Sequence, residues 1–206
     1  MPEEFRETKS MLLLRFAGVC GILGSILPLA LVLSATFLST WFSWNLNALS
    51  ELGVGEQSTL FNSAMLIGGA LNFLFAFGLY KYLGREKLIR AGVVAIMLSS
   101  ISLALVGVFS IDYHVPHVIA ALGYFMLAPV GFLLIGSGTK EDMVRELSFA
   151  CGVAALLAIF VLPFIVLALS LNVGFAVPEL AEGFIISAWT IYMSTKLLKQ
   201  LLMCQY

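Results

Sequence analysis

The sequence is dominated by long apolar runs, each near the length of a membrane crossing. A helix needs about 20 consecutive apolar residues to span the hydrocarbon of a bilayer. The runs are continuously apolar and do not alternate, which favours helices over a membrane β-barrel. Six runs reach this length: residues 11–38, 60–83, 88–109, 116–136, 147–171 and 178–198. We therefore predict an all-α integral membrane protein, a single bundle of six transmembrane helices over residues 1–206.

The composition agrees with a lipid environment. Hydrophobic residues make up 61% of the chain and charged residues 11%, whereas soluble domains have about 25% charged residues. The 206 residues leave room for one bundle and no separate soluble domain, and we expect no nucleic-acid partner. The first apolar run is too long for the core of a cleaved signal peptide. Three scattered cysteines, at positions 20, 151 and 204, favour core packing over a disulfide or metal site.

The basic residues fall on one side of the predicted membrane. They lie before or at the start of the first span, in or beside the turn between the second and third spans, in the turn between the fourth and fifth spans, and at the end of the sixth span. These residues are Arg6, Lys9, Arg15, Lys81, Arg85, Lys87, Arg90, Lys140, Arg145, Lys196 and Lys199. The opposite side carries carboxylates and both histidines: Glu51, Glu56, Asp112, His114, His117, Glu179 and Glu182. Because short cytoplasmic loops are enriched in Lys and Arg, we predict a multi-pass protein of the cell membrane with both termini cytoplasmic.

Residues 110–117 form the connection that holds both histidines. Asp112, His114 and His117 have an Asp-x-His-x-x-His spacing, and these residue types are normal zinc ligands. Three interpretations stay open: a solvated loop whose polar groups bond nearby backbone, a polar binding or proton-transfer site, and a zinc site. Since two imidazoles are a small basis for a closed metal site, we predict no bound cofactor and keep zinc as the alternative.

Other polar residues occur near the same side of the membrane. Glu179 is expected to complement the dipole at the start of the sixth helix. Glu182 lies deeper, where a carboxylate facing lipid is costly, so we expect it to face the bundle interior in a functional or network role. Asn62 is suited to hydrogen bonds between helices. Ser50 precedes Glu51 in a predicted turn, and its hydroxyl is the alternative candidate for a nucleophile.

Three motifs carry a resemblance to a known family: residues 47–53 with 60–63 and 68–69, residues 107–112 with His117, and residues 179–182 with Trp189. Together they resemble an uncharacterised prokaryotic family of six-span membrane proteins, domain of unknown function number 998. The family commonly has Glu-Arg in its third motif, whereas this chain has Glu182 followed by Gly183, which leaves Glu182 without a neighbouring cation.

The resemblance implies a six-span fold and points to particular residues: Ser50, Glu51, Asn62, Asp112, His117 and Glu182. His114 is not part of the family pattern, which weakens a two-histidine metal site. More remotely, the Ser50-Glu51 loop is similar to that of the Frag/DRAM/Sfk group of six-span proteins. Members of that group are linked to lipid remodelling and autophagy, which implies lipid-related work without a transferable mechanism.

Two functions follow from these features. The first is a membrane protein with an outward-facing pocket of acidic residues and histidine, which binds a lipid headgroup or small polar ligand for transport or scaffolding. The second is an intramembrane lipid hydrolase that uses Asp112, His117 and a Glu, with or without a metal. Ceramidase-like enzymes use three histidines around zinc, which two histidines cannot supply. We therefore favour binding, and expect Glu51, Asp112, His117 and Glu182 to converge on one pocket.

Overall fold

The computed structural model describes residues 3–169 and 173–203, and within these ranges it contains helices and loops and no strand. The elements in chain order are α1 (Glu3–Leu38), η1 (Leu49–Gly53), α2 (Ser58–Tyr82), α3 (Lys87–Val108), η2 (Ile111–Tyr113), α4 (Val115–Gly138), α5 (Asp142–Leu156), η3 (Leu157–Val161), α6 (Leu162–Ala168) and α7 (Ala176–Met203). The all-α class is therefore confirmed.

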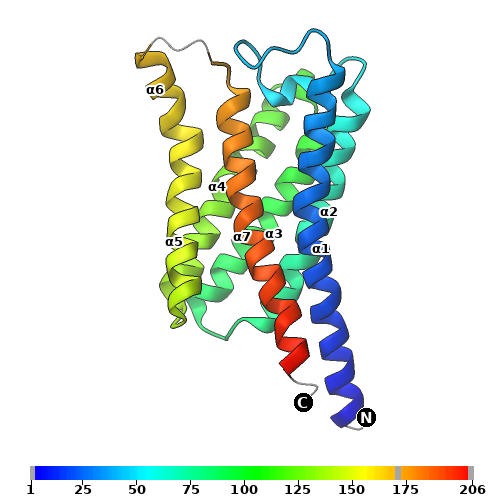
Figure 1. The fold of residues 1–206 in the computed structure, drawn as a ribbon, viewed down its shortest axis with the longest axis vertical. Coiled ribbons are helices and arrows are strands. Elements are labelled where there is room, and N and C mark those ends of the chain that lie inside the picture. The colour runs from blue at the N-terminus through cyan, green and yellow to red at the C-terminus, as the bar shows by residue number, and fades with distance from the viewer. Residues whose placement is uncertain (1–2, 170–172, 204–206) are drawn as a thin grey trace.

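The long helices run side by side in alternating directions (Figure 1). Consecutive helices from α1 to α5 pack against each other, and α7 closes the bundle by packing between α1 and α5. The start of α1, the end of α7 and the turns α2–α3 and α4–α5 lie at one end, which we call the basic end because all the Lys and Arg residues belong to these segments. Residues 39–57, η2 and the start of α7 lie at the other, which we call the loop end.

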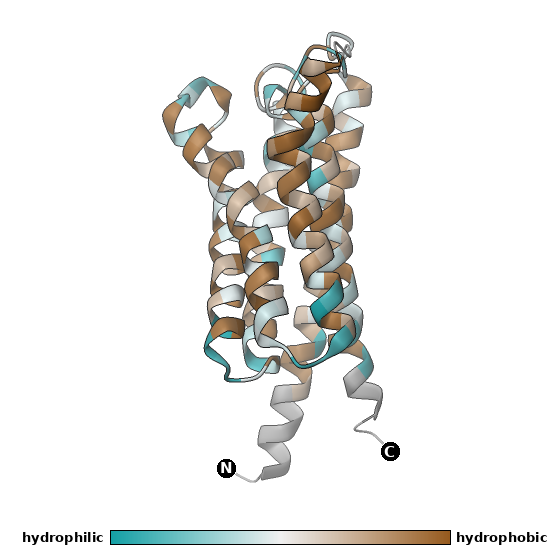
Figure 2. Cartoon of the chain, turned by 90° about the vertical axis from the view of Figure 1, so that its left-hand side faces the viewer, coloured by the Kyte–Doolittle hydropathy of each residue, from teal (hydrophilic) through white to brown (hydrophobic). Residues whose placement is uncertain are grey.

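Five of the helices within the described ranges are long and apolar enough to cross a membrane: Met11–Leu38, Ser58–Tyr82, Lys87–Val108, Val115–Gly138 and Asp142–Ala168. Apolar residues cover their length in Figure 2, and many large apolar side chains on them are exposed. The chain is thus a multi-pass membrane protein. The predicted sixth span, 178–198, lies within α7, which carries Glu179, Glu182 and Lys196 and is not among these five.

The predicted fifth span differs most from the structure. The helix begins at Asp142, before the expected start at residue 147, and a π-helical turn, η3, interrupts it before α6. Pro163 has no N–H to donate to the carbonyl of residue 159 and its ring crowds the preceding turn, which accounts for a wider turn at this place. Residues 170 and 171 of the predicted span, and Asn172 after it, lie outside the described residues.

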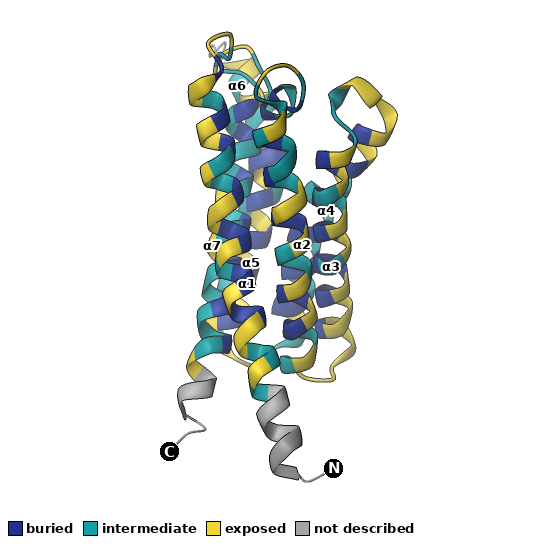
Figure 3. Cartoon of the chain, turned by 90° about the vertical axis from the view of Figure 1, so that its right-hand side faces the viewer, coloured by how far each residue is buried: buried dark blue, intermediate teal, exposed yellow. Residues whose placement is uncertain are grey.

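Buried side chains form two clusters, visible as the inward-facing dark blue positions in Figure 3. In the larger cluster the Trp189 ring stacks on Phe132 with a centroid distance of 4.1 Å, and Trp189 Nε1 donates to Ser148 Oγ at 2.9 Å. This contact joins α7 to α4 and α5. The smaller cluster, near the loop end, includes Leu52 and Phe61 and joins η1 to α2.

Glycines set the separation of α3 and α4. A Cβ on Gly92 would lie 2.6 Å from the carbonyl oxygen of Gly131, and a Cβ on Gly131 would lie 2.7 Å from that of Gly92. The two backbones therefore approach too closely for any side chain at either position, a form of contact common between membrane helices.

We expect Gly92→Val to destabilise the protein, because the new side chain would collide with backbone that cannot move locally. Overpacking of this kind costs about 1–3 kcal/mol. The measurement is the thermal unfolding midpoint of the purified protein. Gly84→Val is the matched control, since a Cβ there meets no atom within 4 Å. Equal midpoints for the two variants would contradict the close α3–α4 contact.

Candidate functional site: a central cavity near the loop end

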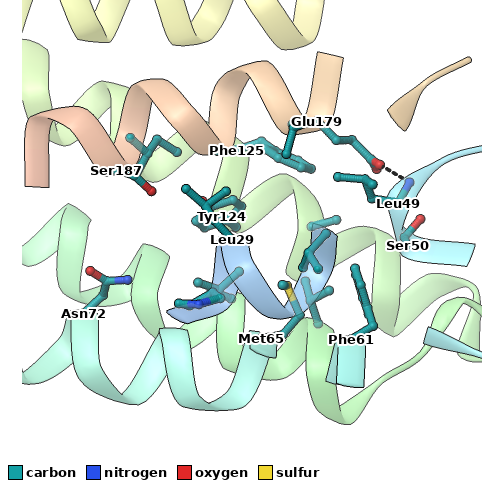
Figure 4. A pocket seen from close by; sticks show the side chains of 18 of the residues that line it. Leu29, Leu49, Ser50, Phe61, Met65, Asn72, Tyr124, Phe125, Glu179 and Ser187 are labelled. Carbon is teal, nitrogen blue, oxygen red and sulfur yellow. Dashed lines mark hydrogen bonds between the residues drawn. The ribbon is translucent and has the colours of Figure 1, made fainter. Parts of the chain in front are cut away.

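A cavity lies between the helices in the half of the bundle near the loop end. It contains about 810 Å³ of atom-free space, part of it open to the outside, and is walled by α1, α2, α3, α4, α7 and η1. Its middle is apolar, with Leu29, Phe61, Met65 and Phe125 among the side chains in the wall (Figure 4). An apolar space between helices with a few polar side chains in its wall is the usual form of a small-molecule site.

Polar side chains stand at both ends of this cavity. Ser50 and Glu179 lie toward the loop end, while Asn72 and Ser187 lie toward the bundle centre (Figure 4). Asn72 is held in place because its Nδ2 donates to the carbonyl of Gly24 at 3.0 Å. The cavity is therefore amphipathic along its length, with an apolar middle between two polar ends.

The loop between α1 and α2 is folded around Asn47 and Glu51. Asn47 Nδ2 donates to Glu51 Oε2 at 2.7 Å, and Asn47 Oδ1 accepts the Ser43 N–H at 2.9 Å. Glu51 Oε1 accepts the Ala48 N–H at 2.7 Å and so caps the start of η1. The side chain of Glu51 is thus occupied with the structure of the loop.

Glu179 fastens this loop to α7. Its Oε2 accepts the Leu49 N–H at 2.5 Å (Figure 4), and two backbone bonds run alongside, from Gly174 N to Trp44 O at 2.8 Å and from Ala176 N to Asn47 O at 3.0 Å. A Cβ on Gly174 would lie 2.7 Å from the Asn47 oxygen, so only glycine permits this approach. We call these contacts the clasp; they form the loop-end wall of the cavity.

His117 lines the same cavity from the start of α4. Its Nδ1 lies 2.7 Å from the carbonyl oxygen of Phe109. A carbonyl can only accept, so Nδ1 carries the proton, and in the neutral ring Nε2 is left with a lone pair. This bond also ties the end of α3 to the start of α4. His114, just before α4, has φ 45°, a backbone conformation that side chains rarely adopt.

Of the four residues that were expected to converge, Glu51, Asp112, His117 and Glu182, only His117 lines the cavity. Asp112 is exposed on η2, and Glu182 is fully buried on α7. Asn62 does not line the cavity, and its Nδ2 donates to the Gly53 carbonyl at 3.1 Å. Ser50 lines the cavity.

Glu179 was expected only to complement the helix dipole, and its place in the cavity wall was not predicted. A signal was present: Glu179, Gly183, Ser187 and Thr190 recur at helical spacing and form the small and polar face of α7 that lines the cavity. Within the described ranges, no group of three His, Cys, Asp or Glu side chains is placed to hold a metal ion.

Comparison with known protein families identifies the family of this chain. The family described as protein of unknown function (DUF998) matches residues 22–196. The chain belongs to this family. All the side chains that line the cavity of this DUF998 protein fall within the matched residues. The comparisons with curated proteins and with solved structures found no match.

We expect Glu179→Ala to open the clasp, because the Leu49 N–H would lose its acceptor. A hydrogen bond to a charged group contributes about 1.5–3 kcal/mol. Glu179→Gln keeps an oxygen acceptor and should retain most of this contribution. The readouts are the thermal unfolding midpoint and the rate of protease cleavage within residues 39–57. Glu56→Ala, an exposed position in the same loop, is the control; a Glu179→Ala protein that resists cleavage as well as this control would refute the clasp.

Proposed function

We propose that this DUF998 protein binds an amphipathic, lipid-like molecule in the central cavity. The supporting observation is the distribution of side chains: an apolar middle suited to hydrocarbon, and at the loop end the hydroxyl of Ser50, the imidazole of His117 and the carboxylate of Glu179. Such a site accepts the polar part of the ligand near the membrane surface and its apolar part between the helices. Transport of this molecule or a scaffold role would build on the same binding.

The cavity is best suited to a ligand whose polar part donates hydrogen bonds. Among the residues that the structure describes, the cavity wall contains a carboxylate and an imidazole but no Lys or Arg side chain. A headgroup with hydroxyl or amine groups can donate to the free Nε2 of His117 and to carboxylate oxygen. A phosphate would meet like charge at Glu179 without a compensating cation.

We propose α7 as the sixth span, with the basic end cytoplasmic. Glu182 is 0% exposed and Glu179 is bonded to the Leu49 N–H, so neither carboxylate faces lipid. Charges turned inward in this way are compatible with a membrane crossing. Lys196 and Lys199 then lie at the end that holds the other cations, in agreement with the bias of cytoplasmic segments.

A hydrolase remains the second candidate, because His117 and Glu179 line one cavity together with the Ser50 hydroxyl. An Asp112–His117 pair through Nδ1 is not formed, since that nitrogen is bonded to the Phe109 carbonyl and Asp112 is exposed. We favour ligand binding over hydrolysis, because binding requires only the side chains that line the cavity.

Single cysteines test the orientation, in a background without native cysteines. Glu56→Cys and Asp112→Cys, both at exposed loop-end positions, should react with a membrane-impermeant maleimide added to intact cells. Lys87→Cys and Lys140→Cys, exposed at the basic end, should react only after the membrane is opened. The reverse labelling pattern would invert the proposed topology.

Filling the cavity tests the binding proposal. Ala121 lines the cavity, so Ala121→Phe should remove the space for a ligand, and lipids that co-purify with the wild-type protein should be lost at least tenfold in mass spectrometry. Ile119→Phe adds the same ring on the exposed face of α4, where Ile119 is 66% exposed, and should leave the bound lipid unchanged. Identical lipid content in the wild type and in Ala121→Phe would refute the proposal.

A further inference from the structure

Four basic side chains gather where α2 ends and α3 begins, in a turn at the basic end of the bundle (Figure 1). They are Lys81, Arg85, Lys87 and Arg90, and Glu86 is the one carboxylate between residues 81 and 90. All four cations are exposed, and we call them the α2–α3 cluster. Four cations against one carboxylate give this short segment an excess of positive charge.

The α2–α3 cluster takes part in no ion pair among the side chains that the structure describes. The ion pairs there join Arg145 to Asp142, with 2.6 Å between Nη2 and Oδ1, and Lys196 to Glu141. Both pairs belong to the α4–α5 turn, α5 and α7, so they neutralise other cations of the basic end. Within this part of the chain, the cations of the α2–α3 cluster are left without a bonded carboxylate.

Aromatic rings of α2 hold two of these cations in place. Lys81 Nζ lies 5.5 Å from the centroid of the Phe77 ring, and Cζ of Arg90 lies 5.4 Å from the centroid of the Tyr80 ring. Both distances are within the range of a cation–π contact, and the second contact crosses from α3 to α2. A ring attracts the charge but offers no oxygen or nitrogen acceptor, so these cations keep N–H donors for an anion.

An exposed apolar row on α3 begins at the same cluster. Arg90, Val94, Leu98, Ile101 and Leu105 follow each other at spacings of three and four residues, which places them on one face of the helix. The four apolar members of this row are exposed. Because α3 is long and apolar enough to cross a membrane, the row contacts hydrocarbon, and the cations lie at its membrane-surface end.

We propose that the α2–α3 cluster binds the headgroup of an anionic phospholipid, with an acyl chain along the exposed row of α3. Phosphate oxygens accept hydrogen bonds from ammonium groups and from the guanidinium fork. Four to eight Lys and Arg beside a membrane span are typical of anionic lipid recognition. A zwitterionic phospholipid would bring its own cation to the cluster, and a soluble phosphate would leave the apolar row without a partner.

Titration of the full-length protein in nonionic detergent, followed by native mass spectrometry, tests this site. Phosphatidylglycerol should bind more tightly than phosphatidylcholine with the same acyl chains. Each Lys or Arg near an anionic headgroup contributes about fivefold in affinity, so Lys87→Gln with Arg90→Gln should weaken phosphatidylglycerol binding at least tenfold. The matched control is Arg15→Gln with Lys199→Gln, which removes one exposed arginine and one exposed lysine of the basic end from α1 and α7. This control should bind as the wild type does.

A photoactivatable phosphatidylglycerol, with a diazirine in its acyl chain, tests the location in the wild-type protein. We expect adducts on α3 between residues 91 and 105. Glycerol 3-phosphate, which has the charge without the acyl chain, should not prevent them. Adducts only on helices other than α2 and α3, or full competition by glycerol 3-phosphate, would overturn the proposal.

The remaining outcomes separate this site from diffuse charge attraction and from the central cavity. Equal affinity for the two phospholipids, or equal weakening in the two double variants, would refute a site at the α2–α3 cluster. Ala121→Phe fills only the central cavity, so phosphatidylglycerol affinity should be unchanged in that variant even if the proposed function fails. Wild-type unfolding midpoints would show that both double variants are folded.

Discussion

A polar side chain that faces lipid is costly because the membrane interior holds no water, and several polar side chains of α7 are turned into the protein. Trp189 is fully buried and bonds to Ser148, Glu179 bonds to the Leu49 backbone, and Glu182 is enclosed, while Phe184 on the other face is exposed. The polar face of α7 thus meets the rest of the bundle. The central cavity depends on this orientation.

Packing in the bundle is uneven, and this unevenness creates the space for ligands. On the α3–α4 side, Gly92 and Gly131 bring two backbones into contact. On the other side α4 and α7 meet where Phe132 stacks on Trp189, and α5, which ends at the π-helical turn, packs against both helices. Beyond that turn α6 leaves the bundle (Figure 1). The central cavity lies in the half near the loop end (Figure 4).

The sequence predicted the all-α class and the apolar membrane helices correctly, because apolar run length reports directly on the hydrocarbon thickness that a helix must cross. It predicted the site less well. Ser50 and His117, which were expected to bind a ligand, line the cavity in the structure. Glu51 and Asn62 bond instead to their own loop, because short polar loops satisfy their backbone groups with nearby side chains. The role of Glu179 depends on a backbone N–H far away in the chain, and residue spacing carries no information on such a contact.

The clasp joins residues from the first loop and from α7, since Leu49 and Glu179 are 130 positions apart in the sequence. A ribosome delivers the chain from the N-terminus at about 5–20 residues per second, so the loop emerges several seconds before the acceptor that fastens it. Until α7 is in place, η1 lacks its bond to Glu179 and the central cavity lacks one wall. The proposed binding site is therefore completed only when α7 has been made, and a nascent chain that stalls before α7 has a membrane domain without this site.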